Sequence, residues 1–313
     1  MNEIDKTILM QRASFLKLIR TFFYQRGYLE LDTPILIRRP GMEPYLDPML
    51  VGSPYSDKEG YLITSPEYSH KKVISKGIDK VFEFSHSFRS GEKGELHTKE
   101  FLLLEFYEVG ITEYGLMEIC RDLLIYLQSE FNSLGVPRES ILSIKVEELF
   151  QNFLGIGFSR DELINYLERN YAEKDYNQMY YEDLFFLVFL NFIEPRFHSS
   201  FFFLHDYPKE LAALAKIENN RACRFELYYG RVELGNGFYE LNSFDEQEKR
   251  FILEQNKRRE LGKEVFEIDH IFIESLKTLP DCSGIAIGLD RLFMVFMGKN
   301  SLKEVSPYYG VID

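Results

Sequence analysis

Residues 282–296 read CSGIAIGLDRLFMVF. Small and apolar residues alternate in the first half, which predicts a strand, and Asp290 and Arg291 then open an apolar helix. Glycine at positions 284 and 288 lets a ligand approach the backbone, and the start of a helix offers N–H donors and positive potential to an anion. The stretch therefore predicts a strand and a helix that either bind an anion where they meet or simply pack together.

Fifty residues upstream, residues 232–241 read VELGNGFYEL. Glu233 and Glu240 stand on either side of a Gly-Asn-Gly sequence, which predicts a turn or bulge within a strand. Two carboxylates that converge from one irregular strand suit Mg²⁺, which combines one or two carboxylates with substrate phosphates. The alternative is a pair of exposed glutamates on an edge strand.

A third polar segment is residues 88–107, FRSGEKGELHTKEFLLLEFY, in which a charged loop separates two strand-like runs. Arg89 can form paired hydrogen bonds with a phosphate, His97 adds a donor, and Phe101 offers a flat apolar face to a base. The segment predicts a hairpin that either binds a nucleotide or is an ordinary solvated turn.

Upstream of this hairpin, residues 15–23 have the apolar spacing of a one-sided helix, and Gly27 follows where a left-handed cap would end it. The alternation in residues 28–37, YLELDTPILI, predicts one strand in which Pro34 requires an edge, a bulge or an interface. Three further short runs are expected to be neighbours in an antiparallel sheet, namely residues 61–64, 81–84 and 101–107.

The second half of the chain is expected to be mainly helical over residues 136–200 and then to return to strands. Residues 224–229 and 232–241 are predicted to form a hairpin joined at Gly230 and Arg231. Because no linker-like or repeated stretch interrupts the sequence, we predict one α+β domain over residues 1–313. Its mainly antiparallel sheet is flanked by helices and carries a helical insertion at 136–200.

Composition excludes several classes of protein. The 313 residues include 37 Lys and Arg against 50 Asp and Glu, a net charge of −13, which argues against broad phosphate binding and hence against a DNA-binding protein. The three cysteines lie far apart, without CxxC spacing, which favours neither disulfides nor zinc. There is no signal-peptide pattern, and the longest apolar run, 184–190, is too short for a bilayer. We therefore expect a cytoplasmic protein that does not bind membranes.

Taken in order, ELDTP at 30–34, the Arg89 hairpin, 232–241 and 282–296 resemble the three signature motifs of class II aminoacyl-tRNA synthetases. The sequences TSPEY at 64–68 and PDCSGIAIGLDR at 280–291 narrow the resemblance to the lysyl branch. It covers nearly the whole chain and is weakest between 136 and 200.

Two features differ from ordinary lysyl-tRNA synthetases. The first motif begins almost at once, which leaves no room for the anticodon-binding OB-fold domain, and Ala286 stands where those enzymes have glycine. Both features resemble the elongation factor P lysine ligase family, which attaches a lysine-type residue to a protein. The resemblance implies an AMP-forming ligase that uses ATP and Mg²⁺, with lysine or (R)-β-lysine as substrate and elongation factor P, rather than tRNA, as acceptor. It also implies a homodimer with Pro34 near the two-fold axis.

The resemblance further implies roles for individual residues. Arg89, Glu233, Glu240 and Arg291 would be catalytic, with Glu233 and Glu240 also holding the metal. ATP would contact Arg89, Glu92, His97, Thr98, Phe101, Glu233, Leu234, Gly288 and Arg291. The amino acid would contact Ser65, Pro66, Glu67, Tyr107, Asn236, Glu240 and Ala286.

One site residue departs from the family pattern. The family's Arg-x-Glu has Gly91 at the third position here, and the acid follows one residue later as Glu92. Either the loop shifts so that Glu92 reaches the adenine edge, or that contact is absent. Two other functions stay open at this point, a minimal lysyl-tRNA ligase that acylates tRNA and a catalytically silent paralogue that senses an amino acid.

Overall fold

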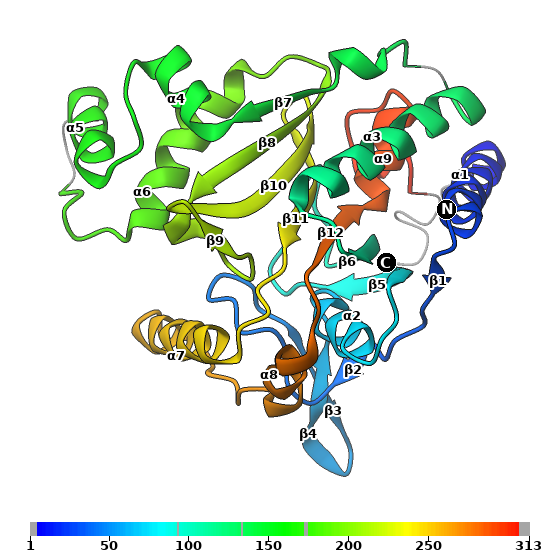
Figure 1. The fold of residues 1–313 in the computed structure, drawn as a ribbon, viewed down its shortest axis with the longest axis horizontal. Coiled ribbons are helices and arrows are strands. Elements are labelled where there is room, and N and C mark those ends of the chain that lie inside the picture. Colours follow the sequence, from blue (N-terminus) through cyan, green and yellow to red (C-terminus); the bar gives the residue numbers. More distant parts are fainter. Residues whose placement is uncertain (1–4, 93, 133, 172–174, 307–313) are drawn as a thin grey trace. The chain divides into compact units, whose positions relative to one another are not determined.

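The computed structural model describes residues 5–92, 94–132, 134–171 and 175–306 (Figure 1). The chain divides into two compact units. The terminal unit comprises Met1–Gly135 and Leu241–Asp313, and the middle unit comprises Val136–Glu240. In the described ranges, no helix combines the length and apolar character needed to cross a bilayer.

The terminal unit contains a sheet in which four strands follow the order β1, β5, β6, β12. The short β1 (Leu29–Glu30) pairs in parallel with β5 (Lys80–Phe88), and β5 is antiparallel to β6 (Glu100–Val109). The last strand, β12 (Cys282–Gly288), is antiparallel to β6. In this register Glu83 of β5, Glu105 of β6 and Ala286 of β12 form one row across the sheet.

One face of this sheet carries the apolar core of the terminal unit. Three helices pack there, α1 (Lys6–Gln25), α3 (Glu113–Glu130) and α9 (Leu289–Phe296). Phe23 of α1 stacks on Phe82 with ring centroids 4.9 Å apart and lies 4.8 Å from Phe106. Because side chains alternate along a strand, the even-numbered residues of β5 and β6 face this core and the odd-numbered Glu83, Glu105 and Tyr107 face the other side.

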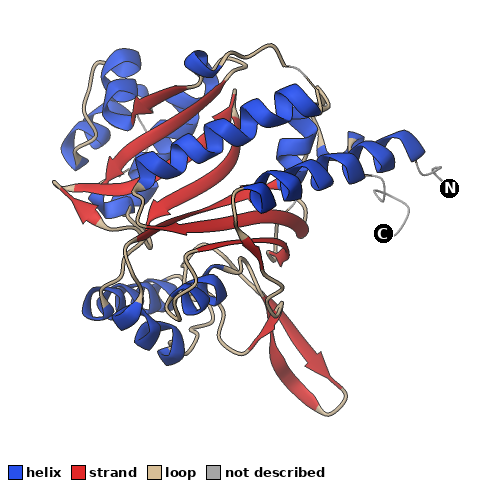
Figure 2. Cartoon of the chain, turned by 45° about the vertical axis from the view of Figure 1, so that its right-hand side comes forward, coloured by secondary structure: helices blue, strands red, loops and turns tan. Residues whose placement is uncertain are grey.

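The opposite face of the sheet is approached by α2 (Glu67–Ile74), which packs against α8 (His270–Ser275) and contacts β5 and β6. The helix α7 (Phe244–Glu260) packs on α8, and the short 3-10 turn η5 (Leu276–Thr278) follows α8. The 3-10 turn η6 (Leu302–Glu304) packs against α9 instead. A separate small sheet has the order β2 (Leu36–Ile37), β4 (Ser56–Leu62), β3 (Met49–Ser53), and its β3–β4 hairpin projects from the rest of the terminal unit (Figure 2).

The middle unit has its own strands in the order β11 (Val232–Tyr239), β10 (Arg221–Tyr229), β8 (Phe201–Pro208), β7 (Leu142–Lys145). The short β9 (Ile217–Glu218) adds to β10, and β7 runs parallel to β8 while the other pairs are antiparallel. Apolar side chains from the helices cover β8 and β10. These helices are α4 (Val146–Leu154), α5 (Arg160–Asn170), α6 (Tyr181–Val188), η2 (Phe189–Ile193) and η4 (Lys209–Leu211). The unit also contains the short 3-10 turns η1 (Arg138–Ser140) and η3 (Glu194–Arg196).

Several predictions about elements are confirmed and others are wrong. The hairpin of β10 and β11 forms as predicted, and so does that of β5 and β6. The expected single strand at 28–37 is instead two short strands in different sheets, because Thr33 donates its N–H to Glu83 and Pro34 has no N–H to give to a ladder. Residues 61–64 also do not join the main sheet, since β4 belongs to the small one.

The segment 136–200 is mainly helical, as predicted, and also contains the short strand β7; residues 172–174 of this segment are outside the described part. A single domain over 1–313 without an OB-fold domain stays a prediction.

Candidate active site

The hairpin between β5 and β6 brings together the residues predicted to bind a nucleotide. Arg89 follows β5, and its backbone N–H donates to the carbonyl of Lys99 at 2.9 Å, which closes the loop. Its guanidinium carbon lies 5.0 Å from the ring centroid of Phe101, and Nη1 is 3.4 Å from Oε1 of Glu92. The Nε of Arg89 is buried and has no hydrogen-bond partner among the described residues. The arrangement leaves this donor available to an anionic ligand.

The start of α9 is tied to the same hairpin. Arg291 donates from Nε to the carbonyl of Leu96 at 3.0 Å, and the carboxylate of Asp290 accepts from the N–H of Leu102 at 2.8 Å. Burial lowers the pKa of His97, and the positive charges of Arg291 and Arg89 lower it further. The neutral form of His97 is therefore favoured in the free protein, and an anion bound beside it would favour the protonated form.

Two of the other residues predicted to contact ATP lie at the edges of this group. Gly288 is the N-cap residue of α9 and pairs with Leu103, so the strand ends where the helix begins. The hydroxyl of Thr98 donates to the carbonyl of Glu100 at 2.6 Å. The structure thus brings Arg89, Glu92, His97, Thr98, Phe101, Gly288 and Arg291 into one part of the terminal unit.

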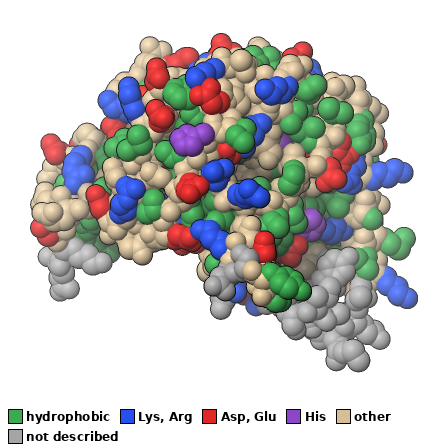
Figure 3. All heavy atoms as spheres, turned by 90° about the horizontal axis from the view of Figure 1, so that it is seen from below, with side chains coloured by type: hydrophobic (Ala, Val, Ile, Leu, Met, Phe, Trp, Pro, Cys, Tyr) green, Lys and Arg blue, Asp and Glu red, His purple; other side chains and the backbone are tan. Residues whose placement is uncertain are grey.

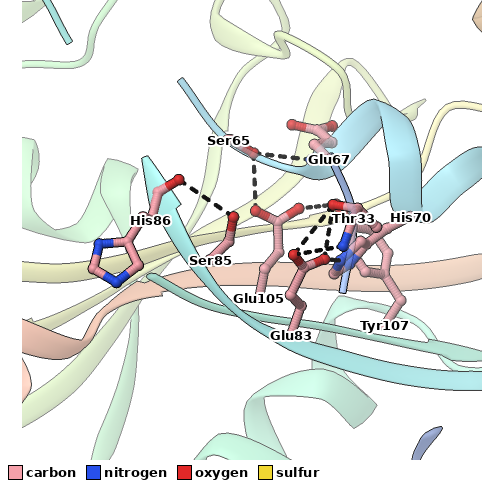
Figure 4. Close-up of polar contacts among 9 residues, drawn as sticks. All are labelled: Thr33, Ser65, Glu67, His70, Glu83, Ser85, His86, Glu105 and Tyr107. Carbon is pink, nitrogen blue, oxygen red and sulfur yellow. Dashed lines mark hydrogen bonds and ion pairs between the residues drawn. The ribbon is translucent and has the colours of Figure 1, made fainter. Parts of the chain in front are cut away.

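A second group lies on the face of the sheet opposite the apolar core (Figure 4). Glu105 is only 1% exposed, and its carboxylate accepts hydrogen bonds from Ser65 Oγ and Tyr107 Oη, each at 2.8 Å. Burial raises the pKa of Glu105 to about 7. Ser65 Oγ also accepts from the N–H of Glu67 at 3.1 Å, and Pro66 is the N-cap residue of α2. A buried carboxylate held by two neutral donors is arranged to bind a cationic group.

The residues around Glu105 include more carboxylates than Lys and Arg side chains. Glu67 pairs with Lys71 at 2.5 Å, and Lys71 is 1% exposed. Next to them His70 Nε2 lies 2.7 Å from Glu83 Oε2, and Thr33 donates to the same carboxylate. Lys71 is thus paired with Glu67, whereas the hydrogen bonds that Glu105 accepts from Ser65 and Tyr107 come from neutral hydroxyl groups. A ligand with an ammonium group would compensate this negative charge.

The neighbouring strand β12 shapes the space in front of these carboxylates. Gly284 lies opposite Tyr107 and Ala286 lies opposite Glu105. A Cβ at position 284 would overlap the Tyr107 ring, so glycine is required for the ring to lie over the strand. The methyl of Ala286, by contrast, stands next to Glu105.

The middle unit holds the remaining predicted residues on β11 and just after it. The register of β11 against β10 shifts between Leu227 and Tyr228, so Leu234 is the extra residue of a β-bulge. A bulge changes the alternation of side chains, and it therefore brings Glu233 to the same face as Asn236 and Glu240 despite the odd spacing. Glu240 is fully buried, and the Oδ1 of Asn236 is buried without a hydrogen-bond partner among the described residues.

The middle unit offers two carboxylates rather than a complete metal cage. Across the described residues, no group of three or more His, Cys, Asp or Glu side chains is placed to hold a metal ion. Glu233 and Glu240 on one face of β11 nevertheless fit Mg²⁺ in the form in which substrate phosphates supply the other ligands. Figure 3 shows Lys and Arg side chains interspersed with Asp and Glu on the face drawn, as suits a protein with net charge −13.

Comparison with known proteins defines the class. The family model of class II tRNA synthetases (D, K and N) matches residues 1–310. The chain belongs to this family and, within it, to the elongation factor P–(R)-β-lysine ligases. An elongation factor P–(R)-beta-lysine ligase homolog of Aquifex aeolicus (strain VF5) is 36% identical over 302 residues, which cover 94% of this chain and 96% of the relative.

Two named ligases are similar over the same length. The elongation factor P–(R)-beta-lysine ligases of Buchnera aphidicola subsp. Schizaphis graminum (strain Sg) and Vibrio atlanticus (strain LGP32) are each 33% identical, over 96% of this chain and 94% of the relative. The predicted fold class, a class II synthetase catalytic fold with a mostly antiparallel sheet and flanking helices, is confirmed.

Sequence reasoning missed Glu105, Lys71 and Glu43 as members of the candidate site. The sequence does indicate Glu105 as a candidate site residue, because it is an acid inside the apolar run LLLEFY, where an ionised side chain needs a partner. The other two gave none, since only the folded chain shows that Lys71 is buried against Glu67 and that a carboxylate oxygen of Glu43 is enclosed.

Proposed function

We propose that this chain is an ATP-dependent, AMP-forming ligase that activates lysine, in the form of (R)-β-lysine, and transfers it to a lysine side chain of elongation factor P. The observation that carries the proposal is the buried Glu105, held by Ser65 and Tyr107 in the same unit as the anion-binding group around Arg89 and Arg291. A substrate with ammonium groups and a carboxylate fits these two sites, because the ammonium suits Glu105 and the carboxylate and ATP phosphates suit the group around Arg89 and Arg291. The proposal that elongation factor P is the acceptor rests on the names of the relatives.

In the first step, a carboxylate oxygen of the amino acid attacks the α-phosphorus of ATP. The bond from that phosphorus to the bridging oxygen breaks, and pyrophosphate leaves with the electron pair. Arg89 holds the α-phosphate and the carboxylate, His97 and Arg291 hold the outer phosphates, Phe101 stacks on adenine, and Thr98, Leu234 and Gly288 line the nucleotide. Such a reaction depends on positioning and on stabilising developing charge. Mg²⁺, when bound, neutralises phosphate charge, and Glu233 and Glu240 are the residues that would hold it.

In the second step, an amine nitrogen of the acceptor attacks the carbonyl carbon of the adenylate. The carbon–oxygen bond to the phosphate breaks, AMP leaves with the electron pair, and the amine loses a proton. Ser65, Pro66, Glu67, Tyr107, Asn236 and Glu240 hold the amino acid during both steps, joined by Glu105. The carboxylates select an ammonium over a neutral side chain, because a buried ammonium without such a partner would be costly.

The choice of (R)-β-lysine rests on Ala286, whose methyl lies in register with Glu105. An additional methyl beside the α-carbon disfavours α-lysine and favours a substrate with its amine one carbon further from the carboxylate. The proposed setting is the cytoplasm, where translation takes place.

The proposed assembly is a homodimer through the segment around Pro34. It is supported by the exposure of Leu29, Ile35 and Leu36, which are 50%, 42% and 48% exposed, respectively. A monomer at micromolar concentration by light scattering would contradict this assembly.

Exchange of labelled pyrophosphate into ATP tests the activation step. The protein is incubated with ATP, Mg²⁺ and either (S)-α-lysine or (R)-β-lysine, with a reaction lacking amino acid as control. We expect exchange that depends on the amino acid and is faster with (R)-β-lysine. Absence of exchange with both isomers would contradict the ligase and favour the amino-acid sensor, provided that lysine still binds.

A further inference from the structure

A pocket of about 310 Å³ lies within the terminal unit, between β2, the loop that follows it, the start of α2 and α8. Its lining includes Ser65 and Glu67, which the proposed function assigns to the amino acid, and also Glu43 and Tyr68, to which no role has been given. The amino-acid pocket therefore extends to a carboxylate that the family motifs do not include.

The carboxylate of Glu43 is enclosed and incompletely bonded. Its Oε2 is buried and has no hydrogen-bond partner in the described part of the chain. It lies over Gly41, where a Cβ would overlap that oxygen. Since a buried carboxylate oxygen without a donor is costly, a ligand that brings a donor to this point would gain from binding there.

The loop that carries Glu43 is held in place by hydrogen bonds from the buried side chain of Arg258. Arg258 is 1% exposed and donates from Nη1 to the carbonyls of Glu43 and Leu46, at 2.8 and 3.0 Å. Its Nη2 lies 3.1 Å from Oδ1 of Asp47. The N–H of Ser90, next to Arg89, donates to the carbonyl of Asp47 at 2.7 Å. The position of Glu43 is thus fixed relative to the segment that holds Arg89.

The charges that act most strongly on Glu43 are those of Glu67, Arg89 and Lys71. Burial, first, and the charge of Glu67 raise its pKa, while Arg89 and Lys71 lower it. The neighbouring hydroxyl of Tyr68 stays neutral, since burial and the charges of Glu43, Glu254 and Glu67 raise its pKa well above the usual value. Burial and the charge of Glu67 disfavour the ionised form of Glu43, so an ammonium group bound beside the two carboxylates would stabilise that form.

We propose that Glu43 is a specificity-determining residue that binds the ammonium group nearest the reacting carboxylate of the substrate. Glu43 lies near Arg89, which holds that carboxylate in the proposed function, and so it is at the end of the amino acid where α-lysine and β-lysine differ. This inference rests on the proposed function. Glu43 thus distinguishes which carbon carries the amine near the carboxylate, whereas Glu105, held by Ser65 and Tyr107, binds the other ammonium group of the substrate.

The test compares three substrates in pyrophosphate exchange, namely (S)-α-lysine, (R)-β-lysine and 6-aminohexanoate, which lacks the amine near the carboxylate. Glu43→Gln keeps the shape and removes the charge. We expect it to lower kcat/KM for (R)-β-lysine by about 10- to 100-fold, the range for a hydrogen bond between charged groups, and to leave 6-aminohexanoate within about twofold. An equal loss with all three substrates, or no loss with any, would overturn the proposal.

Two further variants distinguish an effect of the position of the Glu43 carboxylate from a general effect on folding. Gly41→Ala keeps the carboxylate but displaces it, so it is expected to change the ratio of kcat/KM for (R)-β-lysine to that for (S)-α-lysine without loss of thermal stability beyond a few degrees. Glu148→Gln, at an exposed position of α4, is the control and should change neither ratio nor rate. An unchanged ratio in Gly41→Ala would contradict the assignment. Failure of the wild-type protein to exchange with any substrate would instead overturn the proposed function.

Discussion

Ala286 and Glu105 lie directly opposite each other on the neighbouring antiparallel strands β12 and β6. Directly opposite side chains in such a pair have their Cβ atoms about 5 Å apart, so the Ala286 methyl borders the space in front of the buried carboxylate. One small side chain can therefore decide which isomer of a diamino acid fits, while the carboxylate decides that the ligand is cationic.

The first prediction concerns this methyl group. Ala286→Gly should shift the ratio of kcat/KM for (S)-α-lysine to that for (R)-β-lysine toward α-lysine by about 10-fold, the scale of one methyl-sized change in a pocket. Pyrophosphate exchange with the two isomers measures the ratio. An unchanged ratio would remove Ala286 from the account of specificity.

The second prediction concerns pH and Glu105. Burial raises the pKa of this carboxyl to about 7, so the free protein holds a neutral acid at pH 6 and a carboxylate at pH 8. The KM for the amino acid should fall as pH rises through 7, because the charged form binds the ammonium. Glu105→Gln should raise this KM by about 10-fold or more and remove its fall near pH 7. A parallel pH profile in the variant would contradict the assignment.

The same group makes a prediction about stability. Because its pKa is higher in the folded than in the unfolded chain, the folded state binds the extra proton between pH 4.5 and 7 and loses stability as pH rises through that window. Relative to Glu105→Gln, the wild-type free energy of unfolding should fall by about 3 kcal/mol across it. Denaturant unfolding of both proteins at pH 4.5, 6 and 8 measures the difference, and a constant difference would contradict the burial argument.

A further prediction concerns Gly284 and Tyr107. The Cβ of Gly284→Ala would overlap the Tyr107 ring and push its hydroxyl away from Glu105. We expect the KM for the amino acid to rise about 10-fold, with the KM for ATP nearly unchanged, since the nucleotide group lies around Arg89 and Arg291. Equal changes in both constants would indicate a general disturbance of the fold instead.

The last of the variant predictions addresses the shifted acid. Glu92 Oε1 lies 3.4 Å from Arg89 Nη1, so the acid one residue beyond the family position does reach the arginine. Glu92→Ala should raise the KM for ATP by about three- to tenfold, the effect of one hydrogen bond. Equilibrium binding of ATP checks this, and unchanged affinity would remove Glu92 from the site.

Residues whose chemistry is evident from their own segment could be predicted from the sequence. Arg89, His97, Phe101 and Arg291 stand in polar or glycine-rich stretches between strands, and the structure gathers them in one unit. Glu233 and Glu240 were predicted on an irregular strand, and the bulge at Leu234 confirms the irregularity.

What could not be predicted depends on contacts between distant segments. Glu43 is fixed by Arg258, more than two hundred residues away, and no local pattern shows this. The break of the strand at Thr33 depends likewise on Glu83, and the four-residue β7 forms only because β8 lies alongside it. Short strands of this kind are set by tertiary pairing rather than by their own propensity.

Transfer to the acceptor tests the central claim most directly. Purified protein is incubated with ATP, Mg²⁺ and (R)-β-lysine, with elongation factor P in one reaction and bulk tRNA in another, and intact mass and acid-precipitable label are measured. We predict that elongation factor P gains the mass of one lysyl group and that tRNA stays unlabelled. The gain in mass should be lost when the acceptor lysine of elongation factor P is replaced by arginine. Labelled tRNA with unmodified elongation factor P would contradict the claim and identify a minimal tRNA ligase.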